Sequence, residues 1–196
     1  LRARSQPTIS MGAVFVGSQD GRVYAFDLET GCTKWVFSAS AEVRTGIVLS
    51  TPSEQVSEKN PPLAFFGDLL GRAYAVNALN GKLVWSIRTD DHPSTTLTGT
   101  PAYYQGVLFI PISSLEVVPA ADPNYSCCSF RGSLLAVNGE TGATIWRHYA
   151  IPNKPKIIGK TKLGTDVIAP SGAPIWTSPT IDPKRNLLYV GTGENY

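Results

Sequence analysis

The fold of this chain is decided by the stretch AVNGETGATIW at residues 136–146, because two earlier stretches repeat its pattern. These are AFDLETGCTKW at residues 25–35 and AVNALNGKLVW at residues 75–85. All three fit A-x-[DN]-x-x-[TN]-G-x-x-x-W, and the tryptophans are 50 and 61 residues apart. Each copy is typical of a strand, a tight turn with an Asx residue and a glycine, and a second strand that ends on tryptophan.

Further strands surround each copy of the pattern. A β-rich run precedes each copy, at residues 13–17, 63–67 and 107–111. Another strand is expected to open each unit, at residues 4–9, 44–49, 98–102 and 176–181. Units of about four short strands repeated at this spacing indicate the blades of a β-propeller. The alternative is a generic β-meander in which the Gly-to-Trp spacing recurs by chance.

The predicted fold is therefore all-β, a partial propeller of about three and a half blades. Residues 1–38, 39–90 and 91–150 are expected to form three blades, and residues 170–196 begin a fourth. Because a closed propeller needs at least four blades, we expect the chain to be part of a longer protein. The first residues of the four opening strands would be neighbours around one mouth of the central channel: Arg4, Arg44, Thr98 and Trp176.

Composition narrows the range of functions. Charged residues make up 16% of the 196 residues and the net charge is +2, with no block of like charges. A nucleic-acid-binding surface is therefore disfavoured, because nothing in the sequence makes a basic stripe. The apolar runs are far shorter than the roughly 20 residues that span a bilayer, and no signal peptide is visible.

Two insertions interrupt the blades. Residues 50–62 are polar and are expected to form a solvent-exposed loop. The second insertion, residues 113–130, follows the strand at 107–111 and carries Glu116 and the adjacent Cys127 and Cys128. Long loops on one face of a rigid scaffold are where binding sites are usually built.

The adjacent cysteines leave two interpretations open. Across a trans peptide their Cα atoms would be about 3.8 Å apart, below the range of about 4.4–6.8 Å that is usual for disulfides. A strained disulfide ring and a pair of reduced core cysteines are both compatible with the sequence. The third cysteine, Cys32, stands alone, and there is no C-x-x-C or other metal-ligand spacing.

With these repeats, the chain resembles the quinoprotein alcohol dehydrogenases, eight-bladed propellers that bind pyrroloquinoline quinone (PQQ) and calcium. Residues 16–21, 114–116 and 127–132 resemble the polyvinyl-alcohol-dehydrogenase-like branch of that family. The resemblance implies the N-terminal part of an eight-bladed ring in a periplasmic or secreted protein. Its substrate would be an alcohol, with polymeric and secondary alcohols among the candidates, and its electron acceptor a cytochrome.

The resemblance also implies residues that bind the quinone. Arg44 matches an arginine that pairs with a PQQ carboxylate, a role that suits a planar guanidinium. Thr98 and Ser113 match hydroxyl donors to the polar rim of the quinone. Trp176 matches the tryptophan on which the flat ring stacks. Since haem c is common in relatives but no C-x-x-C-H occurs here, a haem domain would lie outside these residues.

A metal site is implied in the same way. Glu116 matches a glutamate ligand to calcium, a cation that prefers carboxylate oxygens. Glu194 stands where the family has asparagine, so Glu194 and the following Asn195 are alternative ligands, and the identity of the cation is open. Cys127 and Cys128 are expected over the face of the cofactor opposite the tryptophan.

Structural and functional alternatives accompany these expectations. Arg44 could be an exposed arginine at a strand start, and Trp176 a core aromatic; the three motif tryptophans are assigned to packing between blades. The family's catalytic aspartate would follow Tyr196, so no catalytic base is named and the chain alone is expected to be inactive. The alternative function is a non-enzymatic propeller scaffold that binds protein partners. An interaction propeller of the WD or kelch type fits less well, because its Gly-to-Trp spacing differs.

Overall fold

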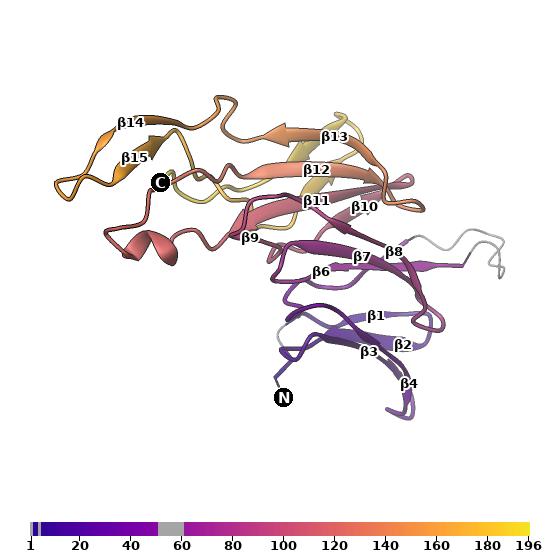
Figure 1. Cartoon of the computed structure of the whole chain (residues 1–196). Coiled ribbons are helices and arrows are strands. Elements are labelled where there is room, and N and C mark those ends of the chain that lie inside the picture. The colour runs from indigo at the N-terminus through magenta and orange to yellow at the C-terminus, as the bar shows by residue number, and fades with distance from the viewer. Residues whose placement is uncertain (1, 4, 51–60) are drawn as a thin grey trace.

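The computed structural model describes residues 2, 3, 5–50 and 61–196. Arg4 and most of the insertion at 50–62 lie outside these described residues. Three antiparallel sheets are stacked face to face, and Figure 1 shows them in chain order from the N-terminal sheet upward. The first sheet runs in the order β1 (Thr8–Ser10), β2 (Ala13–Gly17), β3 (Arg22–Asp27) and β4 (Thr33–Ser38).

The next two sheets repeat this order of strands. The second contains β5 (Val48–Leu49), β6 (Leu63–Gly67), β7 (Arg72–Asn77) and β8 (Leu83–Arg88). The third contains β10 (Ala102–Tyr104), β11 (Val107–Ser114), β12 (Ser133–Asn138) and β13 (Thr144–Tyr149), with β9 (Thr95–Thr96) paired to the end of β11. This is the blade architecture of a β-propeller, as predicted.

The remainder of the chain forms two hairpins and one short turn of helix. The 3-10 turn η1 (Pro119–Ala121) lies in the insertion after β11. The hairpin of β14 (Lys156–Lys160) and β15 (Asp166–Ala169) projects from the stack, and β16 (Thr180–Asp182) pairs with β17 (Leu187–Tyr189). No helix in the described ranges has the length and apolar character needed to cross a membrane.

Burial follows the position of each sheet in the stack. Strand β2 alternates buried and half-buried residues, as expected for a sheet covered on one face. Strand β6 is buried at all five positions because its sheet has a neighbour on both faces. Phe15 and Phe66 belong to the core between the first and second sheets, and Phe65 and Ile110 to the core between the second and third.

The repeated turn owes its shape to the Asx residue and the glycine. Asp27 Oδ1 accepts hydrogen bonds from the Thr30 amide at 3.0 Å and the Thr30 hydroxyl at 2.9 Å. Asn138 makes the same pair of bonds to Thr141 in the third sheet. The motif glycines Gly31, Gly81 and Gly142 have φ of 70°, 71° and 72°, a conformation that suits glycine because it lacks a Cβ atom.

The first two motif tryptophans join successive blades, whereas the prediction of packing between blades for all three is not met by the third. Trp35 Nε1 donates to the Ala78 carbonyl at 2.9 Å, and Trp85 Nε1 donates to the Gly139 carbonyl at 2.8 Å. Both indoles are buried, whereas Trp146 is 41% exposed. Trp146 instead borders an open cleft of about 530 Å³ beside the β16–β17 hairpin.

The opening strands are shorter than predicted. Regular pairing begins only at Thr8, Val48, Ala102 and Thr180. Before that point a hydroxyl replaces backbone pairing. Thr45 Oγ1 donates to the Gly67 carbonyl at 3.3 Å and accepts from the Gly67 amide at 2.9 Å. Ser5 with Gly17 and Thr177 with Gly191 make the same contacts.

The third blade departs from this hydroxyl–glycine pair. Pro111 takes the place of the paired glycine in β11 and has no amide hydrogen to donate. The residue opposite is Gly99, where a Cβ atom would lie 2.9 Å from the Pro111 ring. Strand β11 continues past Pro111 to Ser114, where Ser113 and Ser114 pair with Thr96 and Thr95 of β9. The third blade thus carries its strand further toward the loops that follow.

Candidate functional site

A buried carboxylate stands at the end of this longer strand. Glu116 is 0% exposed, and its two oxygens accept hydrogen bonds from groups more than eight residues away. Oε1 accepts from the Tyr125 hydroxyl at 3.0 Å and the Ser129 amide at 2.9 Å. Oε2 accepts from the Phe130 amide at 2.9 Å. The insertion is therefore folded around this one side chain.

These donors keep Glu116 ionised. Burial raises the pKa of the Glu116 carboxyl, because an apolar surrounding disfavours the charge. The contacts with His92 and the two backbone amides lower the pKa by more, to about 2. Glu116 is consequently a buried anion throughout the neutral pH range.

His92 is held in one orientation beside this carboxylate. Its Nδ1 accepts a hydrogen bond from the Ser94 amide at 3.2 Å, so in the neutral ring the proton is on Nε2. Nε2 lies 3.0 Å from the Ser129 hydroxyl and 3.4 Å from Glu116 Oε1. The imidazole edge packs against the Phe130 ring at 5.5 Å. His92 can thus donate toward the carboxylate from outside the insertion, next to Ser129.

Three chain segments meet next to Glu116. The Gly172 amide donates to the Phe130 carbonyl at 2.7 Å, and the Gly132 amide donates to the Gly172 carbonyl at 2.8 Å. On the other side of this segment, the Ala173 amide donates to the Glu194 carbonyl at 2.8 Å. Residues 129–132, 171–174 and 193–196 therefore lie side by side, which brings the predicted metal ligands into one region.

The C-terminal residues complete this region. The pKa of the Tyr196 hydroxyl is raised, mainly by burial and also by the charges of Glu116 and Glu194. A hydrogen bond with Ser114 lowers this pKa but does not reverse the increase. Tyr196 therefore lies within electrostatic range of both carboxylates. Glu194 and Asn195 are exposed, and Asn195 forms an isolated bridge with Gly172. The two alternative ligands therefore lie on a segment that is bonded to residues 172 and 173.

The segments that carry three of the predicted quinone-binding residues, Arg44, Thr98 and Trp176, lie side by side. The Gly46 amide donates to the Thr100 hydroxyl at 2.8 Å, which places the segment of Arg44 beside that of Thr98. At Gly99, a Cβ atom would lie 2.8 Å from the Thr177 carbonyl, which places the segment of Thr98 beside that of Trp176. The order expected around the channel mouth is therefore observed for these three segments.

The side chains of Arg44 and Trp176 differ in how they are held. Arg44 donates through Nε and Nη2 to the two oxygens of Glu42, at 2.9 and 3.2 Å. Trp176 is 48% exposed, and a Cβ atom at Gly193 would lie 3.1 Å from its ring. The glycine thus leaves room for the indole, which presents open ring surface and is not a core aromatic.

Ser113 is part of a strand and not of a loop, which corrects the sequence expectation. The predicted strand ended at Pro111, but β11 continues to Ser114 because β9 supplies backbone partners for the two serines. Ser113 is 1% exposed, and Thr98 is half-buried. Pairing with β9 thus holds Ser113 in the strand, three residues before Glu116.

Cys127 and Cys128 form a disulfide across a cis peptide bond, with Cα atoms 3.0 Å apart. The trans peptide assumed from the sequence is therefore wrong. Of the two interpretations left open, the structure contains the disulfide and not the reduced pair. Cys128 is 2% exposed. The pair lies against β15, where the Cys128 amide donates to the Ile168 carbonyl at 3.0 Å.

The residues present suit a bound polar group and a cation. Three buried hydroxyls have no hydrogen-bond partner among the described residues: Thr95, Thr96 and Ser171. Buried polar groups normally have a partner, and these three lie on the segments around Glu116. Within the described ranges no three His, Cys, Asp or Glu side chains gather as a metal cluster.

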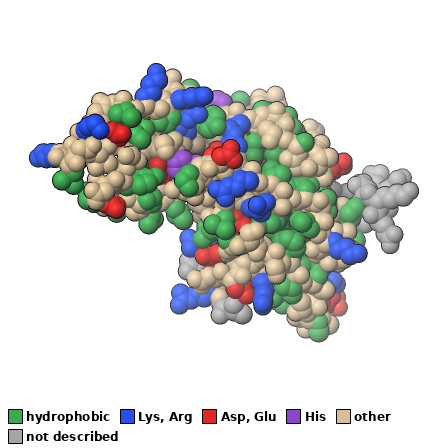
Figure 2. Space-filling model, in the orientation of Figure 1, with side chains coloured by type: hydrophobic (Ala, Val, Ile, Leu, Met, Phe, Trp, Pro, Cys, Tyr) green, Lys and Arg blue, Asp and Glu red, His purple; other side chains and the backbone are tan. Residues whose placement is uncertain are grey.

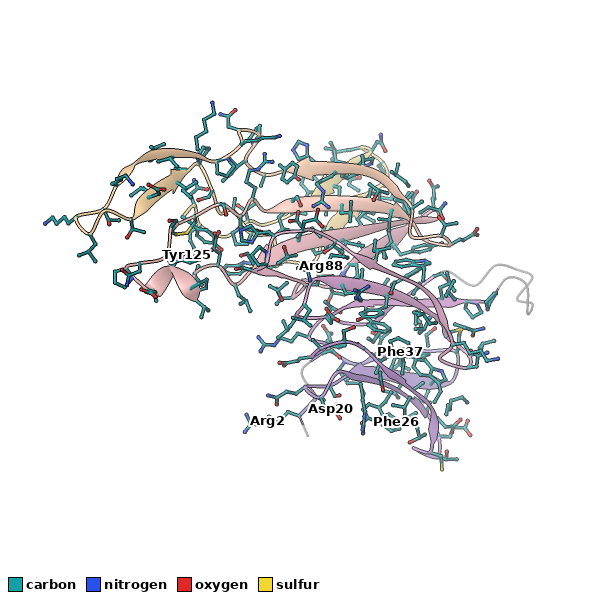
Figure 3. The ribbon with its side chains drawn as sticks, viewed as in Figure 1. Arg2, Asp20, Phe26, Phe37, Arg88 and Tyr125 are labelled. Carbon is teal, nitrogen blue, oxygen red and sulfur yellow. A yellow bond between two sulfur atoms is a disulfide. The ribbon has the colours of Figure 1, made fainter. Side chains whose placement is uncertain are left out.

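Sequence reasoning missed several groups that hold Glu116. These are His92, Tyr125 and Ser129. Two of them flank the cysteine pair, and His92 is one of two histidines in the chain. In Figure 3, Tyr125 lies beside η1, on the side from which the β14–β15 hairpin projects. No spacing in the sequence indicates these contacts, because they join segments 9 to 24 residues apart through loop geometry.

Comparison with known proteins agrees with this architecture. The family described as outer membrane protein assembly factor BamB (PQQ_2) matches residues 2–118. A polyvinylalcohol dehydrogenase from a Pseudomonas species is 38% identical over 192 residues, which cover 97% of this chain and 30% of that protein. A second one, from a Sphingopyxis species, is 36% identical and is covered to 29% of its length.

The solved structures give the same fold. The quinohemoprotein alcohol dehydrogenase from Comamonas testosteroni superposes with a TM-score of 0.72 at 23% sequence identity. The superposition covers 99% of this chain and 29% of that one. The chain therefore spans about 30% of the length of the relatives that it matches.

Proposed function

Since this chain belongs to the PQQ_2 family, we propose that it is part of a quinoprotein alcohol dehydrogenase that uses PQQ and a calcium ion. The observation that carries the proposal is the buried, ionised Glu116, whose hydrogen-bond donor Phe130 is itself bonded to Gly172, four residues before the exposed Trp176. Polyvinylalcohol dehydrogenases are the relatives with the higher identities, so a polymeric or secondary alcohol is the proposed substrate.

Glu116 would hold the cation. Its Oε1 already accepts from Tyr125 and Ser129, whereas among the described residues Oε2 accepts from the Phe130 amide alone. Oε2 therefore has the free lone pair that a hard cation requires. Glu194 and Asn195 remain the proposed further ligands, and a neutral Asn195 oxygen would avoid a second negative charge beside Tyr196.

The cofactor would lie across the inner edges of the first blades. Trp176 supplies a flat apolar platform, and Thr98 and Ser113 supply hydroxyls. Arg44 supplies a guanidinium whose plane is fixed by Glu42, so a second carboxylate would meet it already oriented. Cys127 and Cys128 are proposed contacts on the face opposite Trp176.

A quinone held by Arg44, Thr98, Ser113 and Trp176 would supply a hydride acceptor for the alcohol carbon, and a cation held by Glu116 would supply Lewis acidity toward that quinone. The described residues perform other tasks: they bind and orient, and Glu116 supplies a negative charge that stays ionised at neutral pH. The base that removes the alcohol proton is proposed to lie outside these 196 residues. A cytochrome electron acceptor and a periplasmic or secreted location belong to the same proposal.

A binding titration tests this function. PQQ and calcium are added to the complete protein that carries this chain, and the quinone absorbance is followed. Glu116→Gln should weaken binding of calcium and remove the dependence of PQQ binding on calcium. Trp176→Ala should weaken binding of PQQ by removing its platform. Glu140→Gln is the matched control, because Glu140 is an exposed carboxylate in the turn of the same blade. No binding at micromolar PQQ by the unaltered protein would exclude the enzyme.

The second candidate function is a non-enzymatic scaffold that binds protein partners. The description of the matched family, an outer membrane protein assembly factor, favours it. Such a scaffold has no use for a buried carboxylate, an open indole and an oriented arginine along one rim. The same titration separates the two functions, because a scaffold would bind neither PQQ nor calcium.

A further inference from the structure

The β14–β15 hairpin is an arm with few attachments to the blades. Ile157, Ile158 and Leu163 are 63%, 67% and 68% exposed, and the lysines of the arm are exposed as well. Figure 2 shows lysine and hydrophobic side chains together on this projecting part. An arm with so little buried surface needs a specific attachment to hold a single position.

That attachment is the disulfide pair. The Cys128 amide donates to the Ile168 carbonyl at 3.0 Å, and the Ile168 amide donates to the Cys127 carbonyl at 2.6 Å. Cys127 and Val167 form a parallel bridge. Further out, the Thr165 hydroxyl donates to the Pro123 carbonyl at 2.8 Å. Both polar groups of the peptide bond between the two cysteines therefore hold Ile168 of strand β15.

The same pair borders the amides that hold Glu116. Ser129 and Phe130 follow Cys128 directly, and each donates its amide to one oxygen of the carboxylate at 2.9 Å. A chain that turned freely at 127–128 could not hold both amides toward the carboxylate. The disulfide is thus joined on one side to the arm and on the other to the proposed metal ligand.

We propose that the Cys127–Cys128 disulfide is a positioning element that fixes the arm β14–β15 and the Glu116 carboxylate together. It acts by restricting the backbone whose amides and carbonyls bind both of them. The effect on metal affinity rests on the proposed function, whereas the effect on the arm does not.

The test compares three proteins by hydrogen exchange and by terbium luminescence. They are the unaltered protein, the double variant Cys127→Ser/Cys128→Ser, and the control Cys32→Ser, which removes an exposed free cysteine. Exchange is measured at the amides of Ser129, Phe130 and Ile168. Terbium replaces calcium, and Tyr125, bonded to Glu116, serves as the luminescence sensitiser.

We expect the double variant to exchange at all three amides about tenfold faster and to bind terbium about tenfold or more weakly. Cys32→Ser should change neither, and the amides of β2 and β3 should keep their exchange rates in every variant. Reduction by a water-soluble phosphine is a second route without a mutation. It breaks the Sγ–Sγ bond to give two thiols, while the phosphine takes oxygen from water and becomes its oxide.

Unchanged exchange at Ile168 and Phe130 in both the double variant and the reduced protein would overturn the inference. Faster exchange at Ile168 alone, with terbium affinity intact, would also overturn it, because the disulfide would then hold only the arm. If the unaltered protein binds no terbium, the proposed metal site fails, and the three amides still decide whether the disulfide fixes both elements.

Discussion

The indole Nε1 of Trp85 donates a 2.8 Å hydrogen bond to the backbone carbonyl of Gly139, 54 residues further along the chain. Trp35 makes the equivalent bond to Ala78. Each blade is therefore tied to the next by one buried side chain, and the Ala-to-Trp motif contains both the donor and, in the following copy, the acceptor. Trp146 is the exception, since it is 41% exposed.

Replacing Trp85 by Phe should lower the free energy of unfolding of the 196-residue chain by roughly 1–3 kcal/mol. The Gly139 carbonyl would then be buried without its donor. Denaturant unfolding followed by circular dichroism measures the effect. Trp146→Phe should lower the free energy of unfolding much less. An equal loss at both positions would show that the interblade hydrogen bond is not how Trp85 stabilises the fold.

The motif glycines allow the backbone strain of a side chain to be measured separately from its steric clash with a neighbour. Gly31→Ala places a Cβ at φ +70° with nothing within 4 Å, so only the backbone strain of roughly 1–2 kcal/mol is expected. Gly81→Ala adds a contact of 2.8 Å with the Trp35 ring, worth a further loss of about 1–3 kcal/mol. Thermal or urea unfolding of both variants compares them directly. Equal losses would mean that the ring moves aside without cost.

The hydroxyl–glycine pair can be tested with an isosteric change. Thr45→Val removes the group that bonds both the amide and the carbonyl of Gly67 at a site with 0% exposure. We expect a loss of roughly 1–3 kcal/mol in unfolding free energy, because a buried amide loses its acceptor. Thr177→Val is the control, since that pair is exposed and a change within about 0.5 kcal/mol is expected. Similar losses at both sites would contradict the role of burial.

Glu116 predicts a pH dependence of stability with a definite sign. Its pKa in the folded chain is about 2, below the ordinary value of 4.5. The carboxylate therefore stabilises the fold fully above about pH 5, and this contribution is lost as the pH falls toward about 2. Unfolding of the unaltered chain and of Glu116→Gln should differ most at neutral pH and converge only below about pH 2. A difference that is constant with pH would contradict the ionised state.

The Ala-to-Trp repeats predicted the all-β propeller, the order of its strands and the interblade tryptophans, of which Trp35 and Trp85 are observed and Trp146 is not. The first two features depend on local turn geometry and alternation within each copy. Arg44, Thr98 and Trp176 were expected to be neighbours, and their segments are, since strands at equivalent positions in successive blades lie side by side. Ser113 was misplaced at a loop because the partner strand β9 has only two residues and no periodic signal.

What the sequence by itself determined is therefore the repeated unit and which residues share one rim of it. Only the tertiary structure decided that Glu116 is buried among His92, Tyr125 and two backbone amides. Those contacts depend on how non-repeating loops close on a charged group, which must find hydrogen-bond partners once it leaves water. The repeat carries no record of these loops, because each one is an insertion that occurs once in the chain.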